Sequence, residues 1–171
     1  MIQGGQCLYA DESYMDYFEI GAFLPSPLLT TSMRLGLSDY IPVNMSEIPR
    51  WISENPVDVV LVQVAPPDEE GYFSLGISVD FMKSAIKKGK RVIATVNEEM
   101  PSTFGDSRVS LHEIDFFVKK TYELHETKQP KQSNVERRIA ENVSEIVPNK
   151  ATFQIGIGSI AESILEAFKM K

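Results

Sequence analysis

The 171-residue chain has one cysteine, no long apolar run and no excess of basic charge. Cys7 cannot form an internal disulfide, which fits a reducing compartment and predicts a cytoplasmic protein. Because no run of 18 apolar residues occurs, we expect no membrane span. The first residues also lack the basic and then apolar pattern of a secretory signal. The net charge of −7 argues against general nucleic-acid binding, although a local patch could still hold an anionic ligand.

Histidine is also scarce, which bears on metal and nucleophilic chemistry. His112 and His125 lie thirteen positions apart, with no cysteine or histidine partner at the spacing of a metal site. We therefore expect no bound metal. The sequence shows no recognisable Ser/His/Asp arrangement either.

The stretch 57–96 organises the rest of the chain. Residues 57–64 form a near-continuous β-branched run, typical of a strand buried on both faces, and residues 91–96 repeat the pattern. Between them Ser78 can cap a helix, which Gly89 ends after Lys87 and Lys88; its apolar stripe is Phe81, Met82, Ala85 and Ile86. This order predicts a right-handed βαβ unit. Ligands of open α/β sheets bind beyond the carboxyl ends of strands, where the loop 66–76 would lie.

The remaining elements alternate in the same way. We predict strands at 6–10, 39–43, 109–111, 114–118 and 151–155, and helices at 25–35, after Ser46, after the capping box 133–136 and after a second capping box, 159–162. Four aromatic residues near the start are expected in a core or an interface: Tyr9, Tyr14, Tyr17 and Phe18.

This order indicates an α/β fold with an open, mostly parallel sheet flanked by helices. The polar stretch before Ser133 reads as a linker. We place one domain at 1–127, the linker at 128–132, and the first helix-strand-helix of a second α/β domain at 133–171. One strand with two helices cannot bury a sheet, so the second domain is expected to be incomplete here.

A glycine loop precedes the last helix, in the pattern Gly156-x-Gly158-x-x-Ala161. Its backbone could approach a ligand closely, and the helix N-terminus offers N–H groups to an anion or oxyanion. A dinucleotide fingerprint would need an acidic residue about 20 positions further on, but only ten residues follow Ala161. The glycines could also simply fit a tight strand-to-helix turn.

Several stretches resemble the acetyl-CoA hydrolase/transferase family, which includes the 4-hydroxybutyrate and succinyl-CoA:acetate CoA-transferases. The longest is residues 63–80, QVAPPDEEGYFSLGISVD. Residues 40–49, 96–107 and 112–118 resemble the same family, as does the glycine loop QIGIGSI at 154–160. The resemblance covers nearly the whole chain, from about 39 to about 165, and more loosely from the start. Many members have proline where this chain has Ala161, whereas others have alanine.

This resemblance implies CoA transfer between an acyl-CoA and a small carboxylate, such as acetate or 4-hydroxybutyrate, through a glutamyl-CoA thioester. Acetyl-CoA hydrolysis by the same route is the alternative. CoA is a co-substrate, and no further cofactor is implied. The residues implied to bind CoA or substrate are Gln154, Gly156, Ile157, Gly158 and Ser159 in the glycine loop, and Pro66, Pro67, Asp68, Gly71 and Gly76 in the earlier loop.

For the earlier loop, a rigid proline turn is an equal alternative. Three weaker groups of candidates have simpler explanations. Asn97, Gly105 and Asp106 could form a turn, and Glu98 and Glu99 could lie in a solvated loop. A basic cluster could attract CoA phosphates but is also typical of a solvated helix end: Lys83, Lys87, Lys88, Lys90 and Arg91.

The family's nucleophilic glutamate lies beyond the glycine loop. Glu162 and Glu166 follow that loop here but lack the family's surrounding residues. We therefore expect the chain to correspond to an internal portion of a CoA-transferase, inactive by itself, with no catalytic residue of its own. It would act as a homo-oligomer or with a partner chain that completes the second domain. A non-catalytic fragment or subunit that acts only by association is the alternative of a different class.

Overall fold

The computed structural model describes residues 8–14, 16–26, 29–126 and 132–169. The chain forms two compact units, Met1–His125 and Glu126–Lys171, each of which is described by itself. Most of the expected linker at 128–132 lies outside the described residues.

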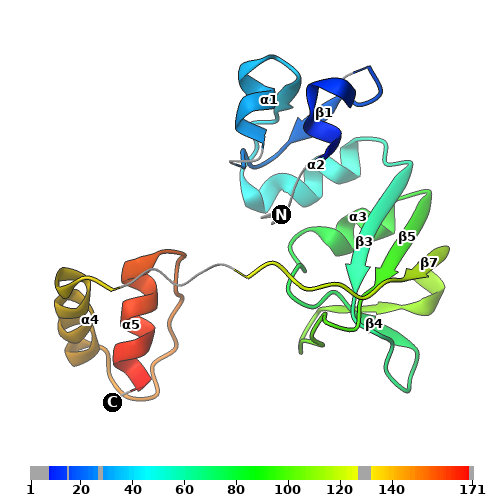
Figure 1. The fold of residues 1–171 in the computed structure, drawn as a ribbon. Helices are drawn as coiled ribbons and strands as arrows, with labels where there is room; N and C mark the ends of the chain where they lie inside the picture. Colours follow the sequence, from blue (N-terminus) through cyan, green and yellow to red (C-terminus); the bar gives the residue numbers. More distant parts are fainter. Residues whose placement is uncertain (1–7, 15, 27–28, 127–131, 170–171) are drawn as a thin grey trace. The chain divides into compact units, whose positions relative to one another are not determined.

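A three-stranded parallel sheet is the centre of the first unit (Figure 1). Its strands are β3 (Val59–Val64), β5 (Arg91–Val96) and β7 (Phe116–Lys119), in the order β3-β5-β7. β3 and β5 pair in register from Val59 with Arg91 to Val64 with Val96. The predicted βαβ unit is confirmed, since α3 (Met82–Lys88) lies between these two strands in the sequence and packs into their core.

Two helices cover one face of this sheet. α2 (Ile48–Glu54) contributes Ile48 and Ile52, and α3 contributes three further buried residues. Alternate positions of the strands meet them because successive side chains of a strand point to opposite faces. The resulting core comprises Ile48, Ile52, Met82, Ala85 and Ile86 from the helices, with Val60, Val62, Val64, Val92, Ala94 and Val96 from the strands.

The other face of the sheet is apolar but uncovered. Leu61 is 70% exposed and Val59 is 52% exposed, while Phe116 and Val118 of β7 are also exposed. The prediction that the first strand is buried on both faces is therefore wrong for this chain. The reason is that both helices pack on the same side, so Val59 and Leu61 on the other face have no layer above them in the described part of the chain.

Two small sheets complete the first unit. β1 (Ile20–Ala22) pairs in parallel with β2 (Ser38–Tyr40), and the short helix α1 (Thr30–Arg34) connects them. β4 (Tyr72–Ser74) pairs antiparallel with β6 (Arg108–Ser110). The loop predicted at 66–76 therefore contains a strand, because its backbone pairs with residues 34 to 38 positions further along the chain.

Three predictions near the start of elements are wrong. The described part of the strand expected at 6–10, Leu8–Ala10, is a 3-10 turn. Ser46 does not cap α2, because it lies inside another 3-10 turn, Met45–Glu47. Ser78 does not cap α3, which begins only at Met82, after Asp80 with its positive φ of 31°.

The aromatic residues near the start do not enter the core. Tyr17 is 78% exposed, and Tyr9, Tyr14 and Phe18 are more than one-third exposed. Tyr9, Tyr14 and Phe18 form a surface cluster, in which the Phe18 ring centroid lies 6.3 Å from that of Tyr9 and 6.5 Å from that of Tyr14.

The described residues of the second unit form two helices, α4 (Asn134–Ile146) and α5 (Ser159–Lys169). The first capping box is confirmed: the Glu136 N–H donates to Ser133 Oγ, and the Ser133 N–H donates to the Glu136 carboxylate. A hydrogen bond with Ser159 is the largest cause that lowers the pKa of Glu136, followed by the Ser133 N–H.

Two predictions in this unit are wrong. Residues 151–155 form no strand, because no second strand in the described part of the unit pairs with them. Phe153 instead packs edge-on against Phe168 of α5, 4.9 Å between centroids. The second capping box does not form: α5 begins at Ser159 itself, and the Glu162 N–H donates to the Gly158 carbonyl.

The two faces of β3 give a matched pair of substitutions. Val60→Ala removes two buried carbons and leaves a cavity, and should lower the free energy of unfolding by about 2 kcal/mol. Val59→Ala, its half-exposed neighbour, should cost less than about 1 kcal/mol, the residual loss of β-propensity. Urea denaturation measures both; equal losses would show that the outer face is covered in solution.

Candidate functional site at the carboxyl edge of the sheet

The parallel strands place their following loops at one edge of the sheet. Val64 pairs with Val96, and Val96 in turn pairs with Lys119, so the three strands end level with one another. The loops 65–76 and 97–107, here called the carboxyl-edge loops, start from this edge. It is the position at which open α/β sheets bind ligands.

A buried asparagine holds the strand ends together. Asn97 is fully buried, and its N–H donates to the Val64 carbonyl at 2.9 Å. Its side-chain Nδ2 donates to the Tyr122 carbonyl at 2.9 Å, while its Oδ1 accepts from the N–H groups of Glu99 and Tyr122. Asn97 was a weak turn candidate from the sequence, and the structure shows it to be a structural link between three segments.

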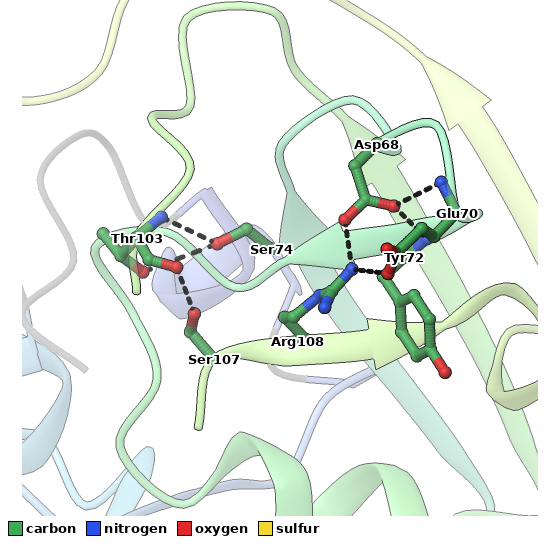
Figure 2. A network of polar contacts seen from close by, with 7 residues as sticks. All are labelled: Asp68, Glu70, Tyr72, Ser74, Thr103, Ser107 and Arg108. Carbon is green, nitrogen blue, oxygen red and sulfur yellow. Dashed lines mark hydrogen bonds and ion pairs between the residues drawn. The ribbon is translucent and has the colours of Figure 1, made fainter. Parts of the chain in front are cut away.

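Asp68 organises the first carboxyl-edge loop. Its Oδ1 accepts from the N–H groups of Tyr72 at 2.9 Å and Glu70 at 3.1 Å (Figure 2). Its Oδ2 pairs with Arg108 Nη2 at 2.5 Å. The Tyr72 N–H is the largest cause that lowers the pKa of the Asp68 carboxyl, and the Arg108 side chain adds to it.

Arg108 ties β6 to this loop. Its guanidinium also pairs with Glu70 at 2.8 Å and lies over the Tyr72 ring, 4.3 Å from the centroid. These side chains are part-exposed, so the ion pairs add little to global stability but fix the shape of the loop. Arg108 was not among the residues predicted from the sequence, because only the β4–β6 pairing, with Arg108 opposite Ser74, brings it within reach of Asp68.

A second polar network joins the two carboxyl-edge loops (Figure 2). The Thr103 N–H donates to Ser74 Oγ at 3.1 Å, and Thr103 Oγ1 donates to the Gly76 carbonyl at 3.0 Å. Ser107 Oγ donates to the Thr103 carbonyl at 2.6 Å. Ser74 and Ser107 are buried, and both hydroxyls form hydrogen bonds with backbone groups: Ser74 accepts from the Thr103 N–H across the two loops, and Ser107 donates within its own loop.

Gly76 permits the close approach of the loops. Its φ is +59°, and a Cβ there would lie 2.6 Å from Met100 Cγ and 2.9 Å from the Pro101 carbonyl oxygen. Gly76 is therefore required by packing, whatever its relation to a ligand.

The basic cluster expected on and after α3 does not gather at one point. Lys90 pairs with Asp58, and Arg91 pairs with Asp115, both at the amino end of β5 and so opposite the carboxyl-edge loops. Lys88 donates to the Ser53 carbonyl. Lys83 pairs with Asp106 in the second carboxyl-edge loop.

The ten predicted ligand-contacting residues occur in both units. In the first unit Pro66, Pro67 and Asp68 are exposed, Gly71 is part-exposed and Gly76 is buried. In the second unit Gln154, Gly156 and Gly158 are exposed, Ile157 is 95% exposed, and Ser159 begins α5. Glu98 and Glu99 lie on an exposed loop. In the described part of the chain, no three His, Cys, Asp or Glu side chains are grouped to hold a metal ion.

Comparison with protein families and curated proteins gives consistent matches. The profile of the acetyl-CoA hydrolase/transferase N-terminal domain matches residues 9–124. A 4-hydroxybutyrate coenzyme A transferase of Clostridium kluyveri is 37% identical over 173 residues, covering 100% of this chain and 40% of that protein. A succinyl-CoA:cyclohexane-1-carboxylate CoA transferase of Geobacter metallireducens is 31% identical, covering 95% of this chain and 38% of that protein.

Solved structures share the fold. A 4-hydroxybutyrate CoA-transferase of Porphyromonas gingivalis aligns with a TM-score of 0.72 and 28% identity, covering 89% of this chain and 40% of that one. RipA from Yersinia pestis aligns with a TM-score of 0.86 over 94% of this chain and 39% of that one; at 23% identity, this likeness shows the fold alone. The chain thus spans about 40% of the length of the relatives it matches.

Asn97→Ala should destabilise the first unit strongly. The change leaves the Tyr122 N–H, the Tyr122 carbonyl and the Glu99 N–H without their partner, which costs about 3 kcal/mol in total. Glu98→Ala, at the exposed neighbouring position, should stay within about 0.5 kcal/mol of the wild type. Chemical denaturation measures both, and a loss for Asn97→Ala no larger than for Glu98→Ala would contradict the assigned link.

Two glycines with positive φ separate steric clash from backbone strain. Gly105→Ala meets no atom within 4 Å and should cost about 1 kcal/mol, the penalty of the left-handed conformation alone. Gly76→Ala carries the same penalty and also forces Met100 aside, so it should lower the melting temperature clearly more. Thermal denaturation by circular dichroism compares them; similar melting temperatures would contradict the packing of the two loops.

Proposed function

This chain belongs to the acetyl-CoA hydrolase/transferase family, and from that premise we propose that it forms part of a CoA-transferase. The proposed reaction moves CoA between an acyl-CoA and a small carboxylate of the acetate or 4-hydroxybutyrate class. The observation that carries this proposal is the 37% identity to a 4-hydroxybutyrate coenzyme A transferase along the whole of this chain. The names of other relatives specify succinyl-CoA with cyclohexane-1-carboxylate, and butyryl-CoA with acetate, so CoA transfer is common to them while the acid varies.

The proposed chemistry runs through a glutamyl-CoA thioester. A glutamate carboxylate attacks the acyl carbonyl and displaces the CoA thiolate, which gives a mixed anhydride. The thiolate then attacks the glutamyl carbonyl, releases the first acid and forms the thioester, which the second carboxylate opens by the same steps in reverse. The reaction needs CoA as co-substrate and no other cofactor. The single cysteine supports a cytoplasmic setting.

Within this scheme the residues of this chain bind and orient rather than react. The backbone N–H groups of Gly156, Ile157 and Gly158 precede α5, that of Ser159 begins it, and all four are available to an oxyanion at the thioester. The exposed residues Pro66, Pro67 and Asp68 present the first carboxyl-edge loop to the acyl-CoA. We assign the nucleophilic glutamate to a segment outside this chain.

Acetyl-CoA hydrolysis is the alternative within the family. It differs only in the final step, in which water instead of a carboxylate opens the glutamyl thioester. Nothing in the carboxyl-edge loops distinguishes water from a carboxylate acceptor, so the identity to transferases favours transfer.

A non-catalytic role by association is the second candidate, and the uncovered sheet face favours it. Parallel sheets are normally covered on both faces, yet Val59, Leu61, Phe116 and Val118 are exposed together on one side. On the same face, the side-chain nitrogen of Gln63 is buried without a hydrogen-bond partner among the described residues. A polypeptide layer from a second copy or a partner chain would cover the four exposed apolar side chains, whereas Gln63 Nε2 is already covered by this chain itself. No helix in the described part of the chain has the length and apolar content to span a bilayer.

The proposed function is tested by incubating the purified chain with acetyl-CoA and several carboxylates, followed by measurement of free CoA, acyl-CoA products and protein mass. We expect the chain to bind acetyl-CoA in calorimetry, without turnover and without a covalent CoA adduct. Failure to bind any CoA species would contradict a substrate-binding role and favour association alone. An adduct mapped to Glu98, Glu99 or Glu162 would contradict the assignment of the nucleophile to another segment.

A further inference from the structure

The turn 103–107 presents a fully exposed aromatic side chain. Phe104 is 105% exposed, more than any other large apolar residue in the described part of the chain. Its neighbours in the sequence are small or polar: Ser102, Thr103, Gly105 and Asp106. A protein-binding hot spot would sit within a packed apolar patch, so the surroundings favour a ligand with its own flat face.

The backbone around Phe104 is held on both sides. Thr103 forms hydrogen bonds with Ser74 and Gly76, and the Ser107 carbonyl accepts a hydrogen bond from the Leu75 N–H at 2.8 Å. The Ser107 hydroxyl then closes the turn onto the Thr103 carbonyl. A ring carried on such a turn loses little further backbone freedom when a ligand stacks on it.

Cationic side chains lie next to the same turn. Lys83 pairs with Asp106, two positions after Phe104. Lys87 is one helical turn further along α3, on the same face as Lys83, and is exposed with no ion pair to any described residue. The pKa of Asp106 is lowered first by its hydrogen bond with Lys83 and, to a smaller extent, by the charge of Lys87, so Lys87 is within electrostatic reach of the turn.

An exposed aromatic face beside a lysine suits a nucleotide, whose base stacks and whose phosphates attract cations. The turn follows β5 at the ligand-binding edge of the sheet. We propose that Phe104 and Lys87 form a docking platform for the adenosine 3′,5′-bisphosphate end of CoA, with Phe104 stacking on adenine and Lys87 facing the phosphates. The identification of the nucleotide as that of CoA rests on the proposed function.

The platform is tested by calorimetric titration of the 171-residue chain with three probes: CoA, 3′,5′-ADP, which carries the nucleotide end alone, and pantetheine, which lacks it. Phe104→Ala should weaken the binding of CoA and 3′,5′-ADP about 5- to 150-fold, the loss of one base–aromatic stack, and leave pantetheine binding unchanged. Phe104→Trp should keep the affinity and add a tryptophan emission that 3′,5′-ADP quenches, against the Trp51 baseline of the wild type. Lys87→Gln should weaken the same two probes and reduce the salt dependence of their binding.

Ile77→Ala is the matched control. It removes another exposed apolar side chain next to the bonded Gly76 but no aromatic face, and should bind all three probes as the wild type does. Thermal melts of every variant establish folding.

The outcomes separate this platform from the proposed transferase function. Unchanged CoA and 3′,5′-ADP affinity in Phe104→Ala would overturn the platform while leaving transfer intact. Absence of 3′,5′-ADP binding by the wild-type chain would also overturn it. A third outcome is that 3′,5′-ADP binds in a Phe104-dependent way, pantetheine does not bind, and acetyl-CoA binds no more tightly than 3′,5′-ADP. That result would support the platform and count against the transferase assignment.

Discussion

The buried amide of Asn97 is the interaction on which the candidate site depends. It joins the end of β3 to the end of β5 through its backbone N–H, and its side chain fixes the segment at Tyr122 that follows β7. A polar side chain without water must satisfy all its hydrogen bonds within the protein, so this arrangement has few alternatives. The parallel register by itself places both loops at one edge of the sheet, whereas Asn97 fixes the backbone path where the chain leaves the strands.

From that edge outward, buried groups shape the loops and exposed groups remain available. Ser74 and Ser107 are buried and hold the turns, whereas Pro66, Asp68 and Phe104 are exposed on them. Such a division is expected of a ligand site, since loops that recognise a substrate are more effective when their backbone is already ordered. The uncovered apolar sheet face is consistent with a chain that spans about 40% of its relatives' length.

The sequence predicted elements whose signal is local. The β-branched runs of β3 and β5 and the capping box at Ser133 are confirmed, because strand propensity and capping depend on neighbouring residues. The caps expected at Ser46, Ser78 and Ser159 fail because the helices begin at other residues. The strand expected at 151–155 failed because a strand also needs a partner, which local sequence does not reveal. Both-face burial of β3 failed for the same kind of reason, since it depends on what packs above Leu61. The family resemblance located the loop around Asp68, but the role of Arg108 could be seen only once β4 and β6 were paired.

The central claim is that the carboxyl-edge loops form a CoA-binding site, and amide chemical-shift mapping of the isotope-labelled chain with CoA tests it most directly. The account predicts that CoA shifts amides of the loops 65–76 and 97–107, including Asp68 and Phe104, while those of Asp58 and Arg91 at the opposite edge stay in place. Shifts confined to the amino edge of the sheet, or no shifts in either loop at saturating CoA, would contradict it.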